Sequence, residues 1–147
     1  MLKRLTEADL AAVLAIDTAT NPHPWTAAQW LDSLNHHQCD GLWQQDELIG
    51  FTVCMVTLDE AELLLIAIAP QWQRQHWASQ LLTALQAQLL QHNVLTLFLE
   101  VRESNQAARA LYVKHDFTPS GRRKGYYPTS EGREDALLYT LHLEDKA

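Results

Sequence analysis

Two side chains of this sequence, Glu100 and Tyr112, have the types and the spacing of an acid–base pair. Glu100 closes the apolar run "LTLFLEV" (residues 95–101), so its carboxylate is expected at the C-terminal end of a strand, partly buried among apolar neighbours and suited to accept a proton. The hydroxyl of Tyr112 can donate a proton to a departing anion. Each also has a simpler explanation: strand alternation turns Glu100 toward solvent, away from Leu99 and Val101, and tyrosine is often a core side chain.

The segment between the two residues is expected to bring them together. The strand ends near Val101, a short connection follows, and a helix over residues 105–115 returns Tyr112 toward the end of the strand. Ser104 or Asn105 is predicted to cap this helix, and Asn105 can instead use its amide on a ligand.

A second feature is the junction "PQWQRQHWASQLL", residues 70–82, where a loop enters a helix. The first turn of a helix presents unpaired N–H groups and positive dipole character, so it can bind an anion such as phosphate, and Arg74 adds charge. No glycine is present to let the backbone approach phosphate closely. An ordinary loop before an amphipathic helix explains the same residues.

The pattern along the chain predicts a strand and helix order of β, α, α, β, β, β, α, β, α, β, β. The clearest helix spans residues 77–91, because its leucines recur at helical intervals without glycine or proline. Thr6 and Thr26 are predicted to begin the two N-terminal helices. The stretch "YYPTSEGRED", residues 126–135, is predicted to be a turn-rich connection between strands at residues 117–124 and 136–143. Helices packed on a mixed, largely antiparallel sheet give an α/β fold of the α+β kind.

Composition indicates one compact domain over residues 1–147, with 47% hydrophobic residues. No apolar run is long enough to cross a bilayer, and charge interrupts the N-terminus before a signal peptide can form, so a cytoplasmic protein is expected. The net charge of −7 is unfavourable for direct nucleic-acid binding and favourable for a basic peptide. Charge of this size also simply keeps a protein soluble.

The cysteines and histidines give little support for a metal or a disulfide. Cys39 and Cys54 are far apart and lack a CxxC spacing, so they are interpreted as small buried hydrophobic residues. The adjacent His36 and His37 have no acidic or thiol ligands nearby in the pattern and are expected at a solvated helix end. No metal site is therefore predicted.

Taken together, these segments resemble a known family. The stretches "IAIAPQWQRQHWASQLL", "LFLEVRESNQAARALYVKHDF" and "RRKGYYPTSEGREDALLYTL" are similar, in order and spacing, to the GNAT N-acetyltransferases. Within that superfamily they resemble the RimI-type enzymes, which acetylate protein N-termini, and the likeness covers almost the whole chain. It implies a central sheet of about seven strands with about four helices.

The resemblance implies that acetyl-CoA enters a V-shaped opening beside the strand that ends at Glu100. It assigns Glu100 as the general base, Tyr112 as the general acid and Asn105 as a cofactor contact. The other cofactor-binding residues that it implies are the strand residues Ile66, Ala67 and Ile68 and the loop and helix residues Gln73, Arg74, Gln75, His76, Trp77, Ala78 and Ser79.

Two positions depart from the family pattern. His76 stands at the first glycine of the phosphate loop, and we expect it to adopt helical or near-helical dihedrals with its ring turned outward. Ala78 is a permitted substitute for the second glycine. Asp116 replaces the glycine before Phe117, at a helix end where a left-handed conformation is expected and where Asp tolerates it better than most residues.

The resemblance further implies that the acceptor is an exposed protein N-terminus, with small-subunit ribosomal protein eighteen as the reference substrate. The residues of "YYPTSEGRED" are expected to line the acceptor groove, with Glu131, Glu134 or Asp135 meeting a basic side chain of the peptide. The alternatives are a plain loop at this position, an enzyme that acetylates lysine or a small amine, and a non-catalytic module that binds acyl-CoA.

Overall fold

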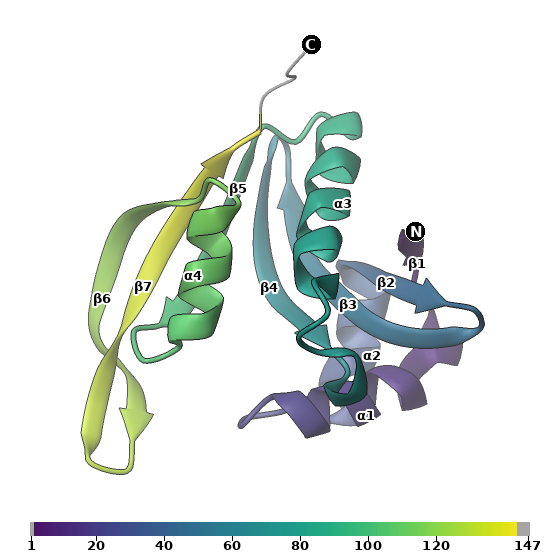
Figure 1. Cartoon of the computed structure of the whole chain (residues 1–147), viewed down its shortest axis with the longest axis horizontal. Helices are drawn as coiled ribbons and strands as arrows, with labels where there is room; N and C mark the ends of the chain where they lie inside the picture. The colour runs from purple at the N-terminus through teal and green to yellow at the C-terminus, as the bar shows by residue number, and fades with distance from the viewer. Residues whose placement is uncertain (1, 144–147) are drawn as a thin grey trace.

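The computed structural model describes residues 2–143 as a seven-stranded sheet with helices on both faces (Figure 1). The strands are β1 (Leu2–Arg4), β2 (Gln38–Gln44), β3 (Glu47–Thr57), β4 (Glu60–Ile68), β5 (Thr96–Arg102), β6 (Thr118–Thr129) and β7 (Gly132–His142). The helices are α1 (Leu10–Thr20), α2 (Ala27–His36), α3 (Trp77–Gln91) and α4 (Gln106–Lys114), with the 3₁₀-helices η1 (Glu7–Asp9) and η2 (Pro70–Trp72). The predicted order of strands and helices and the predicted fold class are confirmed.

The strands lie in the order β1-β2-β3-β4-β5-β7-β6. Neighbouring strands are antiparallel except β4 and β5, which are parallel and are joined through α3. A parallel pair needs a crossover of this length, whereas the antiparallel pairs can be joined by short turns. The sheet is therefore mixed and largely antiparallel, and its one parallel pair lies in the middle.

The two faces of the sheet carry different helices. Helices α1 and α2 pack on one face of β2 to β4, where Trp30 of α2 is fully buried against Phe51 of β3, with ring centroids 5.1 Å apart. Helices α3 and α4 pack on the other face, where the leucines of α3 meet β4 and β5 and Tyr112 of α4 meets β7. Strand alternation lets one sheet serve both apolar layers.

The predicted helix ends are formed by local hydrogen bonds. Thr26 begins α2 as a capping box: its hydroxyl accepts from the Gln29 N–H at 3.1 Å, and the Gln29 side chain accepts from the Thr26 N–H at 2.9 Å. Thr6 caps η1 in the same manner with Asp9. Asp116 follows α4 with φ of 71°, which confirms the left-handed conformation expected there.

The structure corrects the interpretation of residues 126–135 as a turn-rich connection. Strands β6 and β7 continue through most of this stretch and meet at a tight turn between Thr129 and Gly132. Proline and glycine are tolerated because β6 is the edge strand of the sheet, where Pro128 need not donate to a neighbouring strand. The β6–β7 hairpin is accordingly longer than predicted and projects beyond the rest of the sheet (Figure 1).

Cys39 and Cys54 are free, fully buried thiols. This agrees with the prediction that both are small buried hydrophobic residues. Burial raises the pKa of Cys39 to about 11 and that of Cys54 to about 12. Within residues 2–143, no helix has the length and apolar character needed to cross a membrane.

Candidate functional site

The sheet splits between its two parallel strands. Strands β4 and β5 pair from Glu60 and Thr96 as far as Leu63 and Leu99. At that point the register of β4 with β3 shifts, because Val53 lies opposite Leu65 while Cys54 lies opposite Leu63. The extra residue is a β-bulge, which bends its strand and increases the local twist. Beyond the bulge the two strands diverge, and the gap between them opens downward in Figure 1.

A cavity of about 800 Å³ occupies this split. It is lined by the diverging ends of β4 and β5, by the start of α3, by α4, and by the segment that joins α1 to α2. Because α4 and the α1–α2 segment lie on opposite faces, the cavity passes through the sheet and can hold two substrates that approach from different sides. Its size is within the range of ligand-binding clefts.

Twelve of the thirteen residues predicted for the site line this cavity. They are Ile66, Ala67, Ile68, Gln73, Arg74, His76, Trp77, Ala78, Ser79, Glu100, Asn105 and Tyr112. Gln75 is the exception, and its amide donates instead to the Gln71 carbonyl at 3.3 Å. Residues far apart in sequence are therefore brought to one cavity, although their individual roles stay predictions.

The loop before α3 contradicts the expectation for His76. His76 is the N-cap of α3 with φ of 67° and ψ of 12°, which is left-handed and not helical. Arg74 is left-handed as well, with φ of 63°. His76 thus adopts the conformation of the glycine that it replaces, because the chain must turn sharply to aim the first amides of α3 at the cavity.

His76→Gly is expected to stabilise the protein slightly and to leave acetyl-CoA binding at least as tight. A non-glycine residue in the left-handed region costs about 1–2 kcal/mol. The freedom of glycine in the unfolded chain offsets about half of that, so we expect the free energy of unfolding to rise by about 0.5–1 kcal/mol. Urea denaturation measures the change, and calorimetry measures the affinity.

The matched control is Gln75→Gly, because Gln75 is not among the residues with positive φ in the described chain. Glycine there relieves no strain and should lower the free energy of unfolding by about 0.5–1 kcal/mol. Equal losses in the two variants would contradict strain at His76. A large loss of acetyl-CoA affinity in His76→Gly would instead make the imidazole itself a ligand.

Glu100 lies on the face of β5 away from the buried Leu99 and Val101, as alternation predicted. Its side chain is 23% exposed, and its Oε1 lies 2.9 Å from Nε of Arg123 on β6. The sequence predicts apolar neighbours around this carboxylate and does not indicate a guanidinium partner. In the structure the ion pair with Arg123 fixes the orientation of the carboxylate.

Tyr112 is 6% exposed and reaches the cavity from α4. Its ring packs against Phe117 and Tyr139, with centroids 5.5 Å and 6.3 Å away. Burial raises the pKa of Tyr112 to about 12, so its hydroxyl is protonated at neutral pH. The side chain is thus both rigid and able to donate a proton.

Asn105 caps α4, since its Oδ1 accepts from the Ala108 N–H at 3.2 Å. This is one of the two outcomes that the sequence left open. Asn105 also lines the cavity, so the cap fixes its side chain at the cavity wall.

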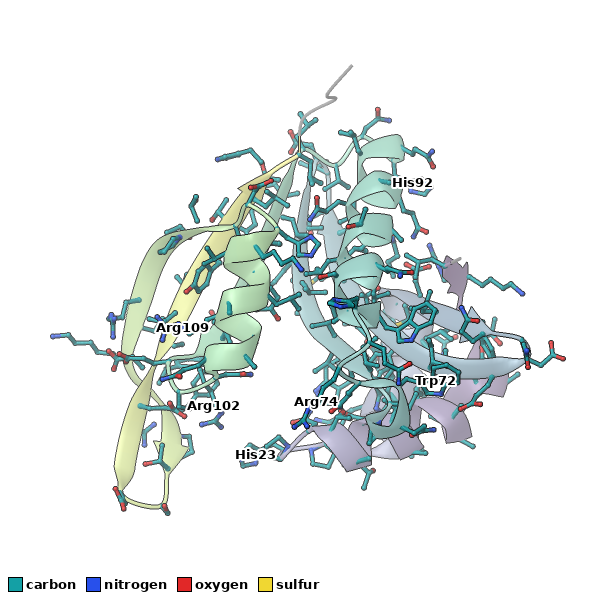
Figure 2. All side chains as sticks on the ribbon, viewed as in Figure 1. His23, Trp72, Arg74, His92, Arg102 and Arg109 are labelled. Carbon is teal, nitrogen blue, oxygen red and sulfur yellow. The ribbon has the colours of Figure 1, made fainter. Side chains whose placement is uncertain are left out.

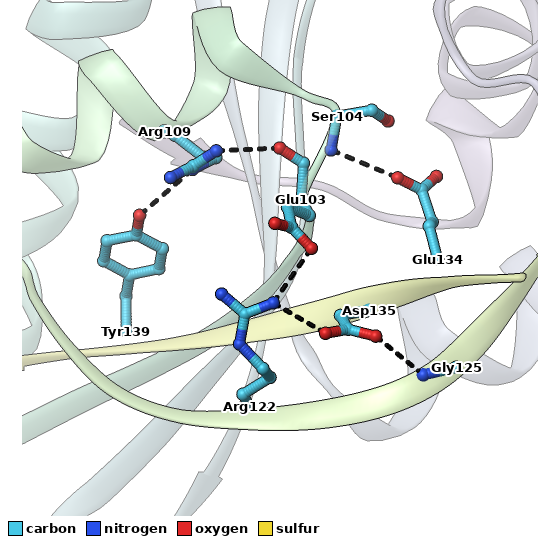
Figure 3. A network of polar contacts seen from close by, with 8 residues as sticks. All are labelled: Glu103, Ser104, Arg109, Arg122, Gly125, Glu134, Asp135 and Tyr139. Atoms are coloured by element: carbon cyan, nitrogen blue, oxygen red, sulfur yellow. Dashed lines mark hydrogen bonds and ion pairs between the residues drawn. The ribbon is translucent and has the colours of Figure 1, made fainter.

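A polar network secures the end of β5 to β6 and β7 (Figure 3). Arg122 contacts Glu103 at 2.9 Å and Asp135 at 2.6 Å, and Asp135 also accepts from the Gly125 N–H. The guanidinium of Arg122 and the backbone N–H hold the pKa of Asp135 below its usual value.

Glu134 belongs to a second part of this network. It accepts from the Ser104 N–H at 3.1 Å and forms an ion pair with Arg102 at 3.0 Å, and these two donors lower its pKa. Glu134 and Asp135 were expected to meet a basic side chain of a peptide. The structure engages both within the chain, while Glu131 is exposed at the hairpin turn, and the contact of any of the three with a peptide stays a prediction.

The sequence does not indicate that the end of α1 and the segment after it reach the cavity. Its lining includes Asp17 and Thr20 of α1 and the following residues Asn21, Pro22 and His23. Figure 2 shows His23 beside Arg74 at the mouth of the cavity, with Arg102 on the opposite wall. Proximity of this kind is set by tertiary packing and has no local sequence signal.

Asp17 of α1 holds the segment between α1 and α2 in place through its hydrogen bonds. Its carboxylate is 1% exposed and accepts from Asn21 Nδ2 at 3.0 Å, from the Trp25 N–H at 2.9 Å and from Trp30 Nε1 at 3.0 Å. A buried carboxylate is tolerated when it is satisfied in this way. The loop at the cavity mouth is therefore anchored to the core.

Comparison with known proteins agrees with this geometry. The profile of the acetyltransferase (GNAT) family matches residues 8–117. The ribosomal protein bS18-alanine N-acetyltransferase of Haemophilus ducreyi is 37% identical over 145 residues, covering 97% of this chain and 100% of that protein. The Escherichia coli protein of the same name is 37% identical, with 97% of each chain covered. The crystal structure of an Escherichia coli ribosomal-protein alanine N-acetyltransferase superposes with a TM-score of 0.92 at 35% identity, covering 100% of this chain and 96% of the other.

Proposed function

The chain belongs to the GNAT acetyltransferase family, and on that basis we propose that it transfers the acetyl group of acetyl-CoA to the N-terminal alanine of ribosomal protein bS18. The observation that carries the proposal is the near full-length identity of 37% to two bS18-alanine N-acetyltransferases, over a chain that places a carboxylate and a protonated phenol on one cavity. The acceptor is thus a protein N-terminus.

The cavity has the donors and the size that acetyl-CoA requires. Amides at the start of α3 offer unpaired N–H groups and positive dipole character for the pyrophosphate, and Arg74 adds a charge. The diverged end of β4 offers backbone groups to the pantetheine arm, since no described strand pairs with that side of β4 beyond Leu63. Asn105 also lines the cavity, where its side chain is expected to contact the cofactor.

The reaction assigns one proton transfer to each of the two residues. The α-amino group of a peptide has a reference pKa of about 7.7–8.0, so it is mostly protonated at neutral pH and must lose a proton before it attacks. Glu100 takes that proton, directly or through a water. The nitrogen then bonds to the thioester carbon, the carbon–sulfur bond breaks, and the departing thiolate takes the proton of Tyr112. The second proton that the nitrogen releases on becoming an amide returns Tyr112 to its protonated form.

The proposal is tested by steady-state acetylation of a peptide that carries the bS18 N-terminal sequence beginning with alanine. We expect transfer to this peptide and none to the same peptide with a blocked N-terminus. Equal transfer to both would assign the activity to a lysine side chain. Binding of acetyl-CoA without transfer to any amine would make the protein a non-catalytic acyl-CoA-binding module.

A further inference from the structure

The Glu100 carboxylate forms an ion pair with Arg123 of the same chain. Arg123 Nε lies 2.9 Å from Glu100 Oε1, although twenty-three residues separate them and β7 runs between their strands. The register explains the contact: Arg102, Ala136 and Arg123 stand opposite one another across β5, β7 and β6. Because Ala136 is small, the Arg123 side chain can extend over it toward β5.

The contact lies on the acceptor side of the cavity. Residues opposite one another across a sheet share a face, and Glu100 shares its face with Arg102 and Arg123. Leu99 and Val101 point the other way, into the core beneath α3 and α4. The carboxylate and its partner therefore face away from the helices that border the cofactor side.

Arg123 is the least restrained of the three arginines on β5 and β6. Arg102 is 27% exposed, bonds Glu134 and stacks on Tyr127 at 4.3 Å, and Arg122 binds two carboxylates. Arg123 is 55% exposed and meets one carboxylate among residues 2–143. A pair in which one partner is largely exposed contributes little to stability, so it can be exchanged easily.

The Arg123 guanidinium has a second contact besides Glu100. Its Cζ lies 5.5 Å from the centre of the Tyr126 ring, and that ring is 49% exposed. Cation–π attraction can hold the guanidinium there after it leaves Glu100. Arg123 also borders an irregular part of β6, because the register of β6 with β7 shifts between Arg123 and Tyr127.

We propose that Arg123 occupies the place of the acceptor's α-ammonium group on Glu100 and that the acceptor displaces it on binding. The inference rests on the proposed function and adds a positioning residue to it. The incoming amine is a cation until Glu100 removes its proton, so amine and guanidinium compete for one carboxylate. Arg123 keeps the Glu100 carboxylate oriented between turnovers, and an acceptor without a free ammonium group cannot exchange with it.

The test compares Arg123→Gln with the wild-type protein on two peptides, one with a free N-terminal alanine and the same peptide N-acetylated. With CoA present, calorimetry should show the free peptide binding about 1.4- to fivefold more tightly to Arg123→Gln, the range that the loss of a partly exposed ion pair implies. The acetylated peptide should bind equally to both proteins. In the acetylation assay the peptide KM should fall by the same factor, with kcat within about twofold.

Two further variants keep the result specific. Arg123→Lys retains the charge and should restore the wild-type KM, and Lys124→Gln removes a charge one residue away and should leave both peptides unaffected. If Arg123→Gln still transfers acetyl groups but its peptide KM is unchanged or higher, the inference is wrong. It is also wrong if both peptides bind more tightly to Arg123→Gln by the same factor. Absence of transfer by the wild-type protein would overturn the proposed function and this inference with it.

Discussion

Replacing Glu100 by glutamine is expected to lower kcat by about 10²–10⁴-fold, the usual contribution of a general base. Glutamine has the same shape but cannot take the proton of the acceptor's ammonium group. The affinity for acetyl-CoA should be unchanged, because Glu100 lies on the face of β5 opposite the core residues Leu99 and Val101, which pack toward α3 and α4. Steady-state kinetics with the alanine peptide measure the first quantity, and calorimetry with acetyl-CoA measures the second.

Glu103→Gln is the matched control for this variant. Glu103 lies three residues further along the chain and is also paired with an arginine, Arg122, at 2.9 Å. It does not line the cavity, so its kcat should stay close to that of the wild-type protein. If Glu100→Gln retained more than about a tenth of the wild-type kcat, Glu100 would not be the base.

Replacing Tyr112 by phenylalanine is expected to lower kcat by about 10²-fold or more, because the departing thiolate loses its proton donor. The pKa of about 12 means that the hydroxyl is fully protonated over the neutral range, so the loss should not depend on pH there. The ring contacts with Phe117 and Tyr139 remain in the variant. The melting temperature should therefore change little, which separates the chemical effect from a folding effect.

Tyr139→Phe provides the comparison on the same cluster. The Tyr139 hydroxyl accepts from Arg109 Nε at 3.3 Å and is part of the network around β5 (Figure 3). Its removal should affect stability modestly and kcat hardly at all. Equal kcat losses in the two variants would show that Tyr112 acts through packing and not as an acid.

Elements with a strong local signal were predicted well from the sequence. Helix α3 begins at Trp77 and ends at Gln91, as predicted, because its leucine stripe runs without interruption. Thr26 and Asp116 were also interpreted correctly, since capping and left-handed helix ends depend on a few neighbouring atoms. Such features depend only on residues within a few positions along the sequence.

The β6–β7 hairpin was predicted too short because its sequence contains Pro128, Gly125 and Gly132. These residues normally mark loops, but an edge strand accepts them where a central strand does not. Whether a strand lies at the edge is a property of the whole sheet. The local composition therefore gave the wrong boundary.

Site features that depend on distant residues escaped prediction for the same reason. The Glu100–Arg123 pair requires the register of three strands, and the anchoring of the α1–α2 segment requires Asp17 to meet Trp30 thirteen residues away. His76 shows a different limit. Its position matched a glycine of the family pattern, yet the conformation had to be observed, because a histidine can adopt either a helical or a left-handed backbone.

The bulge at β4 divides this strand into a part that is paired with β5 and a part that is not. Up to Leu63 it is an interior strand, and beyond that residue its side toward β5 is an open sheet edge. An open edge at the rim of a sheet invites pairing with another copy of the chain and hence aggregation. Here the edge borders a cavity of about 800 Å³ that is also lined by residues of α3 and α4. An extended segment of a ligand that enters this cavity can therefore pair with β4 as an added strand would.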